Sequence, residues 1–258
     1  MSFLEHLEVL RWHLVRASIA VVLFAILIFI FPSFVFDKII LAQKYSDFWT
    51  YRVFCELSHW LGKDDLLCMG DINFELINIT MSGQFSMHIM VSLIGGLILA
   101  FPYLLFEIWK FISPALAEKE RRYAQRLIFS GSILFAIGIL FGYYFISPFS
   151  VQFLGNYQVS TLVKNQVTLD SFISTIATVT LAGGLVFQLP LIVYFLSKVG
   201  IVTPEFMRKF RKHAIVVTLI VSAILTPPDV MSQVLMSIPL LILYEFSIFV
   251  SKRVVKNK

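Results

Sequence analysis

The residues best suited to binding chemistry lie in one polar stretch, 111–123, which reads FISPALAEKERRY. If this stretch is helical, Glu118 has arginines three and four residues later, a spacing that favours an ion pair within the helix. Glu120 has no basic residue at the corresponding positions. We therefore predict that the Glu120 carboxylate accepts a cation from another molecule. The alternative interpretation is an ordinary solvated acid in a loop.

Two cysteines offer a second kind of chemistry. Cys55 and Cys68 lie in one polar segment between two apolar runs, so they share a compartment. In an oxidising compartment we expect them to form a disulfide, which contributes about 3 kcal/mol for a loop of this size. Two unpaired thiols are the alternative. A metal site with His59 is disfavoured, because no further His or Cys lies near enough in the sequence to complete it.

Composition determines the environment in which these residues must be placed. Of the 258 residues, 58% are hydrophobic and 14% are charged, and the mean hydropathy is +0.84. Soluble domains carry about 25% charged residues. The chain therefore cannot cover a water-exposed surface, and we predict an all-α membrane protein whose solvent is the lipid bilayer.

Six charge-poor runs are the predicted transmembrane helices of a single domain, 1–258. They are 17–36, 76–106, 127–163, 171–197, 214–228 and 230–251. The first four reach the roughly 20 apolar residues that a bilayer requires, whereas the last two are expected to form short helices. Segment 32–75 is predicted to be mostly an extended periplasmic loop. No cleavable signal peptide is evident before the first run.

The placement of lysine and arginine predicts the orientation of these helices. Most of the 21 Lys and Arg residues fall on one side of the membrane, together with both termini. The other side receives only Lys38, Lys44, Arg52, Lys63 and Lys164. Because positive charge accumulates in cytoplasmic loops, both termini are predicted to be cytoplasmic. No basic patch interleaved with aromatic residues suggests a nucleic-acid partner.

Common enzyme motifs are missing from the sequence. It has no HExxH, no GxSxG, no glycine-rich phosphate loop and no paired acids within a predicted helix. We therefore expect no catalysis, no cofactor and no metal. A secondary transporter of a small solute is the alternative function, and it would require inverted repeats, broken helices and an intramembrane charge. Only Gln188 with Pro190 favours that alternative.

Several motifs together resemble those of one family. They are HLEVLR at 6–11, FxxPALxxxER at 111–121, and LTPPD at 225–229 followed by Ser232 and Gln233. In their order and spacing they resemble TatC, the receptor subunit of the twin-arginine protein translocase in the bacterial cytoplasmic membrane. The resemblance covers almost the whole chain.

The resemblance implies a concave bundle of six helices with a defined task. Such a receptor binds the paired arginines in the signal peptides of folded precursor proteins at the cytoplasmic face. It recruits the single-span proteins TatA and TatB, and export is driven by the proton gradient. Self-association in a larger complex is also implied.

The resemblance assigns signal-peptide binding to the 111–123 stretch, with Glu120 as the recognising acid beside Arg121, and Phe111 and Pro114 shaping the loop. Carboxylates suit this task, because guanidinium groups bind them bidentately and stay charged. Lysine should therefore replace arginine poorly in the signal peptide.

The first motif departs from the family pattern. The second acid of the family is expected at position 9, where this chain has Val9, and the nearest acid is Glu8. One residue corresponds to about 100° around a helix, so the Glu8 carboxylate is predicted to point away from the site. We rank Glu8 below Glu120 as a binding residue.

Gln188 is a further departure, since the family often has a glutamate at this point of the fourth predicted helix. A polar residue at this depth is a functional candidate. Alternatively, its amide satisfies the Val186 carbonyl, from which Pro190 removes the usual hydrogen-bond donor.

The turn between the last two predicted helices carries the remaining candidates. The family motif draws attention to Thr226, Asp229 and Gln233, whose side chains could bond a transmembrane helix of a partner. The alternative is a plain turn with Asp229 as a helix N-cap. Glu245 lies about two turns before Lys252, close to the cytoplasmic surface, and is expected to reach water or a neighbouring base.

Overall fold

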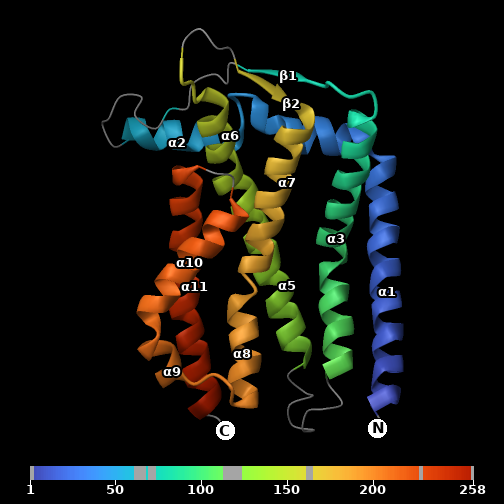
Figure 1. Cartoon of the computed structure of the whole chain (residues 1–258), viewed down its shortest axis with the longest axis vertical. Coiled ribbons are helices and arrows are strands. Elements are labelled where there is room, and N and C mark those ends of the chain that lie inside the picture. The colour runs from blue at the N-terminus through green and yellow to red at the C-terminus, as the bar shows by residue number, and fades with distance from the viewer. Residues whose placement is uncertain are drawn as a thin grey trace.

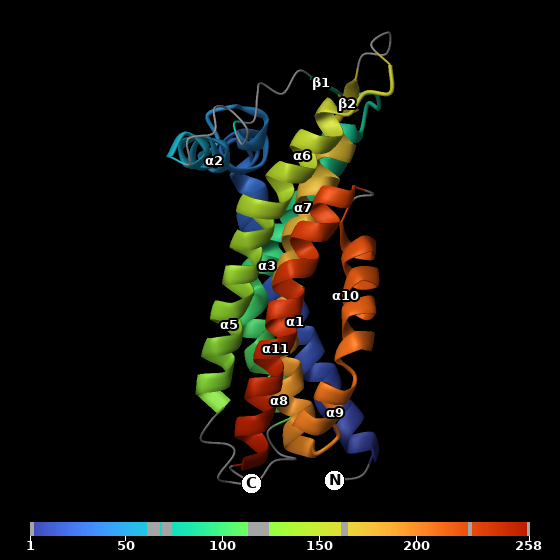
Figure 2. The same ribbon diagram turned by 90° about the vertical axis from the view of Figure 1, so that its left-hand side faces the viewer.

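The computed structural model describes residues 3–60, 68, 74–112, 124–160, 165–226 and 229–256. Long helices run side by side, and α1 (Phe3–Ile30) begins at the end of the bundle at which α11 (Val230–Lys256) finishes (Figure 1). We call this end the terminal end. The opposite end, here called the cap end, carries α2 (Trp49–Trp60) and a small sheet (Figures 1 and 2).

Five helical segments in the described part of the chain are long and apolar enough to cross a bilayer. They are Leu7–Ile30, Gly83–Ile112, Leu127–Asn156, Leu169–Val199 and Ser232–Val255. The second is α3 (Gly83–Ile112), the third joins α5 (Ala124–Phe141), η4 (Gly142–Ile146) and α6 (Ser147–Asn156), and the fourth joins α7 (Leu169–Val186) and α8 (Leu189–Val199). The prediction of an all-α membrane protein is confirmed.

The fifth predicted run, 214–228, forms a helix of only 15 residues, α10 (Arg211–Leu225), which follows the short α9 (Pro204–Lys209). At 1.5 Å per residue its length is about 22 Å, less than the roughly 30 Å of a bilayer's hydrocarbon core. The expectation of a short helix here agrees with the structure.

The final helix differs from the expectation, because α11 has 27 residues rather than a short apolar stretch. Glu245 does not interrupt it. The Glu245 carboxylate accepts a hydrogen bond from the Arg211 guanidinium at 2.6 Å, and both side chains are about half exposed. A paired acid at the edge of the bundle neither ends a helix nor has to be buried alone.

The described part of segment 32–75 also differs from an extended loop. It contains the π-helix η1 (Phe34–Ile40), the 3-10 helix η2 (Leu41–Lys44) and α2, which lies across the bundle at the cap end (Figures 1 and 2). Strand β1 (Glu75–Ile77) pairs in parallel with β2 (Gln166–Thr168), so that Leu76 faces Val167 across the ladder.

Side-chain hydrogen bonds to the transmembrane bundle explain why this segment folds. The buried Gln43 side chain donates to the Tyr143 carbonyl at 3.0 Å and accepts from the Ser147 hydroxyl at 2.6 Å. The Tyr51 hydroxyl donates to the Gln43 carbonyl, and the Thr50 hydroxyl donates to the Tyr144 carbonyl at 2.6 Å. Apart from the bond between Tyr51 and Gln43, these contacts join residues about a hundred positions apart, which no local pattern reveals.

Small residues let the helices approach closely. A Cβ atom at Gly96 of α3 would lie 2.8 Å from the Val21 carbonyl oxygen of α1, and one at Gly138 of α5 would lie 2.5 Å from the Gly183 carbonyl oxygen of α7. Helix interfaces in membranes favour such residues because lipid provides no hydrophobic force between helices. Serine pairs add hydrogen bonds between α11 and its neighbours. They are Ser150 with Ser232 and Ser197 with Ser251.

Candidate functional site

The predicted recognition loop connects α3 to α5 at the terminal end. Its residues Pro114, Glu120 and Arg121 lie outside the described residues. The flanking helices are described, and α3 packs along α1. The end of α3 therefore lies beside the first turns of α1 (Figure 1).

A carboxylate and an imidazole meet between α1 and α3, near the end of α3 from which the loop departs. The Nδ1 atom of His13 lies 2.5 Å from the Oε2 atom of Glu107. The two side chains are 11% and 4% exposed. Removing a carboxylate from water is unfavourable unless a partner is close, and His13 supplies that partner.

Aromatic and basic groups surround this pair. The Phe111 ring, one turn after Glu107 on α3, lies edge-on to the His13 ring at 6.1 Å between centroids. The Tyr103 hydroxyl and the Arg16 guanidinium are further groups that interact with the Glu107 carboxylate. Of the residues predicted from the motifs, Phe111 is thus the one that contacts this pair.

Glu8 is exposed on α1. Five residues separate Glu8 from His13, about 140° around the helix, so the two side chains lie on different faces. Val9 precedes His13 by four residues and shares its face, so the face directed at α3 carries no acid at position 9.

Sequence reasoning missed both His13 and Glu107. The first apolar run was taken to start at residue 17 and the second to end at 106, whereas α1 starts at Phe3 and α3 ends at Ile112. An acid directly after an apolar run, and a histidine one turn before another, were the available signals. Neither identifies its partner, because 94 residues separate them.

Gln188 lies in the two-residue break between α7 and α8, and its side chain is buried. Its Nε2 atom donates to the Gly131 carbonyl of α5 at 3.1 Å, and its Oε1 atom has no hydrogen-bond partner. The amide therefore bonds a neighbouring helix rather than the Val186 carbonyl, and one acceptor stays open within the membrane-spanning part.

The turn near the cap end places its polar groups against the chain itself. The Asp229 carboxylate accepts from the Ser232 amide at 2.6 Å, which confirms the predicted N-cap of α11. The second carboxylate oxygen of Asp229 is buried without a partner. The Gln233 side chain donates to the Leu219 carbonyl of α10 at 3.3 Å, and the Thr226 hydroxyl donates to the Ser222 carbonyl.

A cavity of about 280 Å³ opens beside this turn, between α7 and α10. The hydroxyl-bearing residues that line it are Ser174, Thr175, Thr178 and Thr226. Hydroxyl groups facing the membrane interior can bond the backbone or the side chains of another transmembrane helix.

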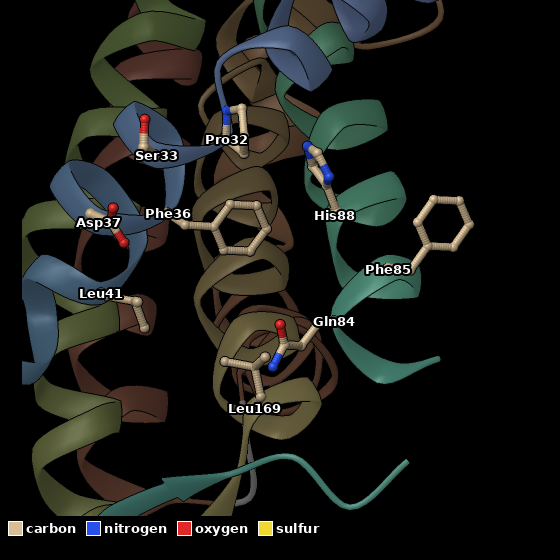
Figure 3. Close-up of a pocket in the computed structure, with 9 residues that line it drawn as sticks. All are labelled: Pro32, Ser33, Phe36, Asp37, Leu41, Gln84, Phe85, His88 and Leu169. Atoms are coloured by element: carbon tan, nitrogen blue, oxygen red, sulfur yellow. The ribbon is translucent and has the colours of Figure 1, made fainter. Parts of the chain in front are cut away.

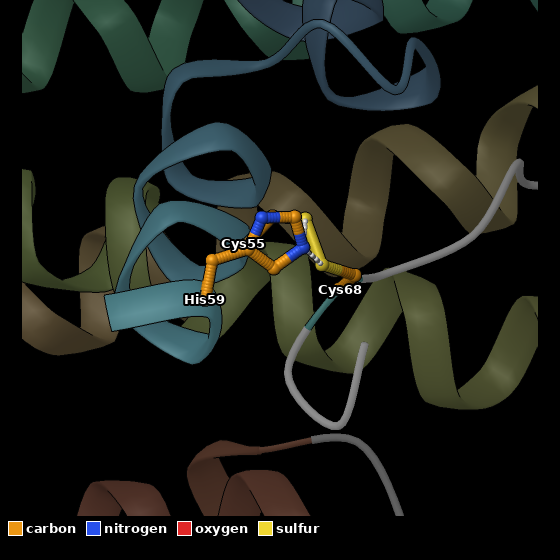
Figure 4. A group of neighbouring side chains, drawn as sticks. All are labelled: Cys55, His59 and Cys68. Atoms are coloured by element: carbon orange, nitrogen blue, oxygen red, sulfur yellow. Dashed lines mark hydrogen bonds between the residues drawn. A yellow bond between two sulfur atoms is a disulfide. The ribbon is translucent and has the colours of Figure 1, made fainter. Parts of the chain in front are cut away.

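The two cysteines are joined by a disulfide, which ties the middle of α2 to Cys68 (Figure 4). The His59 Nε2 atom lies 3.7 Å from the Cys68 sulfur and 3.9 Å from the Cys55 sulfur. Sulfur atoms bonded to each other cannot act as thiolate ligands, so this trio does not form a metal site in the oxidised chain.

Another cavity, of about 510 Å³, lies between η1, the first turns of α3 and the start of α7 (Figure 3). The His88 ring at its wall stacks on Phe29 at 4.0 Å and meets Phe36 edge-on. This packing places the His88 ring at the interface of α3 with α1 and η1. The cavity lies at the cap end, away from the His13–Glu107 pair.

Comparison with known proteins identifies the family. The family model described as "Sec-independent protein translocase protein (TatC)" matches residues 5–239. A TatC protein of Blattabacterium sp. subsp. Periplaneta americana is 38% identical over 263 aligned positions, covering 100% of this chain and 97% of the relative. The TatC protein of Aquifex aeolicus is 33% identical, covering 100% of this chain and 98% of the relative.

Solved structures agree with this assignment. A crystal structure described as the twin-arginine translocase receptor TatC superimposes with a TM-score of 0.72 at 32% identity, covering 97% of this chain and 99% of that one. A second crystal structure of the receptor, in DDM, gives a TM-score of 0.73 at 33% identity, covering 95% and 98%. Family, sequence relatives and fold coincide over nearly the whole length. The chain therefore belongs to the TatC family of Sec-independent protein translocase proteins, multi-pass membrane components of a translocase rather than enzymes.

Proposed function

We propose that the chain is the receptor of a twin-arginine translocase, which binds Arg-Arg signal peptides of folded cargo at its terminal end. The observation that carries this proposal is the buried Glu107 carboxylate beside the departure point of the Glu120 loop. Carboxylates held away from bulk water bind guanidinium groups strongly and bidentately. Glu107 and the Glu120 of the adjoining loop would provide one carboxylate for each of the two arginines of the signal.

The proposed binding surface combines the motif residues with the newly found acid. Glu120 is the principal acid, and Phe111, Pro114 and Arg121 shape its loop. Glu8 contributes at the exposed edge of α1. Glu107 supplies a carboxylate on the α3 face that meets α1, with His13 as the partner that an incoming guanidinium displaces. An arginine is suited to displace it, because the planar guanidinium binds a carboxylate bidentately and keeps its charge.

The proposed orientation places the terminal end in the bacterial cytoplasm and the cap end in the periplasm, with the chain in the inner membrane. The excess of Lys and Arg on the terminal side supports it. A disulfide at the cap end agrees with an oxidising periplasm. Together with the five long spans, α10 then brings the number of membrane helices in the single domain to six.

Partner binding is proposed for the other polar residues. Single-span partners of the TatA and TatB type would dock along α7 and α10, at the cavity lined by hydroxyl groups beside the turn with Thr226, Asp229 and Gln233. The open amide oxygen of Gln188 would accept a hydrogen bond from such a helix. Assembly into a larger complex and export driven by the proton gradient complete the proposal.

Photo-crosslinking tests signal recognition. A photoreactive residue replaces Ile112, the last residue of α3, and labelling is compared for a signal peptide with Arg-Arg and one with Lys-Lys. The Arg-Arg peptide should label more strongly, and Glu120→Ala should lower its labelling by about tenfold or more, the equivalent of a lost charge-assisted hydrogen bond.

Glu205→Ala is the matched control, because Glu205 is an exposed acid of α9 at the terminal end. It should leave the labelling unchanged. Equal labelling by both peptides, or labelling that does not respond to Glu120→Ala, would contradict receptor function at this surface.

A further inference from the structure

Helix α2 presents an uncovered apolar stripe. Trp49, Val53, Leu57 and Trp60 recur at intervals of four, four and three residues and so lie on one flank of the helix. Their exposed fractions are 56, 37, 42 and 82%. Water does not favour four apolar side chains gathered on one surface, which indicates that something covers this flank.

The other exposed flank of α2 is polar. Arg52 and Glu56 lie on it, and the Arg52 guanidinium is 3.5 Å from the Asp47 carboxylate. These two side chains are 63 and 87% exposed, as expected for an ion pair in water. Glu56 follows Trp49 by seven residues, about 20° around the helix, so the charged flank adjoins the apolar stripe on the exposed face. An apolar surface bordered by charged residues is typical of a helix that lies in a membrane interface.

The rotation of α2 about its axis is fixed, so the direction of the stripe is fixed as well. Its inner face is held by Thr50 and Tyr51 through the hydrogen bonds described above and by the disulfide at Cys55. The Phe54 ring packs against Phe145 and Phe149 of the third membrane segment. A helix held at these points cannot roll to hide the stripe.

The stripe continues the lipid-facing surface of the bundle. The Trp49 ring packs edge-on against Tyr144 at 5.5 Å between centroids, and Tyr144 belongs to the segment Leu127–Asn156 that is long and apolar enough to span a bilayer. The adjacent Phe145 is 40% exposed. Figures 1 and 2 show α2 crossing the bundle direction at the cap end and extending beyond α5 and α6.

We infer that α2 is an interfacial anchor, which buries the Trp49–Val53–Leu57–Trp60 stripe in the leaflet at the cap end while its polar flank stays in water. The bound surface is the boundary between lipid headgroups and acyl chains. Tryptophan is enriched at this depth because its ring is apolar and its N–H group hydrogen-bonds to headgroups. A tryptophan at each end of the stripe holds the whole helix parallel to the membrane plane.

Depth-dependent fluorescence quenching tests this inference independently of any translocation activity. The chain contains four tryptophans, so replacing Trp12, Trp49 and Trp109 by phenylalanine leaves Trp60 as the single reporter. The variant is placed as single copies in lipid nanodiscs, with phosphatidylcholine brominated near the carbonyl end of one acyl chain. Trp60 should lose about half of its emission and resist iodide, as expected for a ring at the interface.

Two further single-tryptophan variants calibrate the measurement. Trp109 is 8% exposed and should respond weakly to either quencher. Trp12 lies on the lipid-facing side of α1, is 53% exposed and serves as the exposed reference. A variant that retains Trp49 in place of Trp60 repeats the test at the other end of the stripe, in case one variant folds poorly. Circular dichroism checks that each variant keeps its helices.

Quenching of Trp60 by iodide but not by brominated lipid would overturn the inference, because α2 would then stand in water. Protection from both quenchers would overturn it equally, since protein would then cover the stripe. The same measurement in discs that hold several copies provides a further comparison. If Trp60 is protected from both quenchers in those discs but not in single-copy discs, a second copy of this chain covers the stripe.

Discussion

The two ends of the bundle are stabilised by different chemistry. At the terminal end, α1 and α3 are joined by a buried pair of titratable groups, His13 and Glu107. At the cap end, the corresponding contacts are neutral hydrogen bonds around Gln43 and a disulfide at Cys55. The interaction between two titratable groups depends on their protonation, and each group can exchange its partner. The neutral hydrogen bonds of the Gln43 amide and the covalent disulfide do not depend on protonation in this way. The contact at the terminal end can therefore be replaced by another cationic partner, whereas the contacts at the cap end hold their segments together permanently.

Removing one member of the charged pair should give the largest effect. Glu107→Ala leaves His13 buried opposite an empty site and is expected to lower the free energy of unfolding by about 3–5 kcal/mol. The measurement is equilibrium unfolding in detergent micelles. Glu8→Ala, an exposed acid of α1, is the matched control and should change stability by less than about 0.5 kcal/mol.

The double replacement His13→Leu with Glu107→Leu sharpens this test. Two apolar residues of similar size should restore most of the stability, because no unpaired polar group remains buried. An equal loss of stability in the double variant and in Glu107→Ala would contradict this explanation, because it would show that the interaction between His13 and Glu107 itself stabilises the fold.

Loss of the disulfide is the next largest expected effect. Replacing Cys55 and Cys68 by serine should lower the free energy of unfolding by about 3 kcal/mol, because the loop that they close, at a sequence separation of 13, is no longer constrained in the unfolded chain. Dithiothreitol should destabilise the parent chain by a similar amount and leave the serine variant unaffected. An equal response of both proteins to the reductant would contradict this assignment.

Alkaline pH should weaken the cap end through Tyr51. Burial raises the pKa of the Tyr51 hydroxyl well above its ordinary value of 10.0. Above pH 10 the unfolded chain therefore releases a proton that the folded chain retains. Stability is complete below that pH and should fall by about 1.4 kcal/mol per pH unit above it. Tyr51→Phe lowers the starting stability but should reduce the slope, and an unchanged slope would exclude Tyr51 as its source.

The N-cap of α11 should contribute less. Asp229→Ala removes the acceptor of the Ser232 amide and is expected to cost about 1 kcal/mol, whereas Asp229→Asn keeps an acceptor and should stay close to the parent. Thermal unfolding of the three proteins side by side measures the difference. Identical losses for alanine and asparagine would point to the charge rather than to the cap.

Gln188→Leu should have the smallest effect. It removes one hydrogen bond to Gly131 but also removes a buried oxygen without a partner, so the change should stay within about 0.6 kcal/mol. If binding of a single-span partner weakens in this variant while stability holds, the open oxygen of Gln188 belongs to the partner site. A large loss of stability would instead show that the Gln188 side chain stabilises the fold through its hydrogen bond to Gly131.

Much of the architecture could be predicted from the apolar runs, since their lengths are set by bilayer thickness and their ends by charge. The length of α11 could not, because Glu245 is neutralised by Arg211 from another helix. Nor could the fold of segment 32–75, where Gln43 and Thr50 bond backbone groups of a helix far along the chain. Contacts of this kind leave no local periodicity.

The candidate site divides in the same way. Phe111 and Asp229 were identified by motif, and Asp229 caps its helix as predicted. Glu107 and His13 were not, because their pairing depends on how α1 packs along α3 rather than on either sequence alone. A single acid next to an apolar run does not differ, in sequence, from an ordinary residue at the membrane surface.

The short α10 has a consequence for the membrane itself. If α10 crosses the membrane as proposed, a helix of about 22 Å beside spans of full length obliges the adjacent lipids to compress by several ångström. The hydrocarbon barrier is then thinnest along this flank of the protein. A polar surface that crosses there loses its hydration over a shorter path than anywhere else around the bundle. Because α10 is about one and a half turns shorter than the hydrocarbon core, the membrane's barrier to polar solutes is weakest beside this helix.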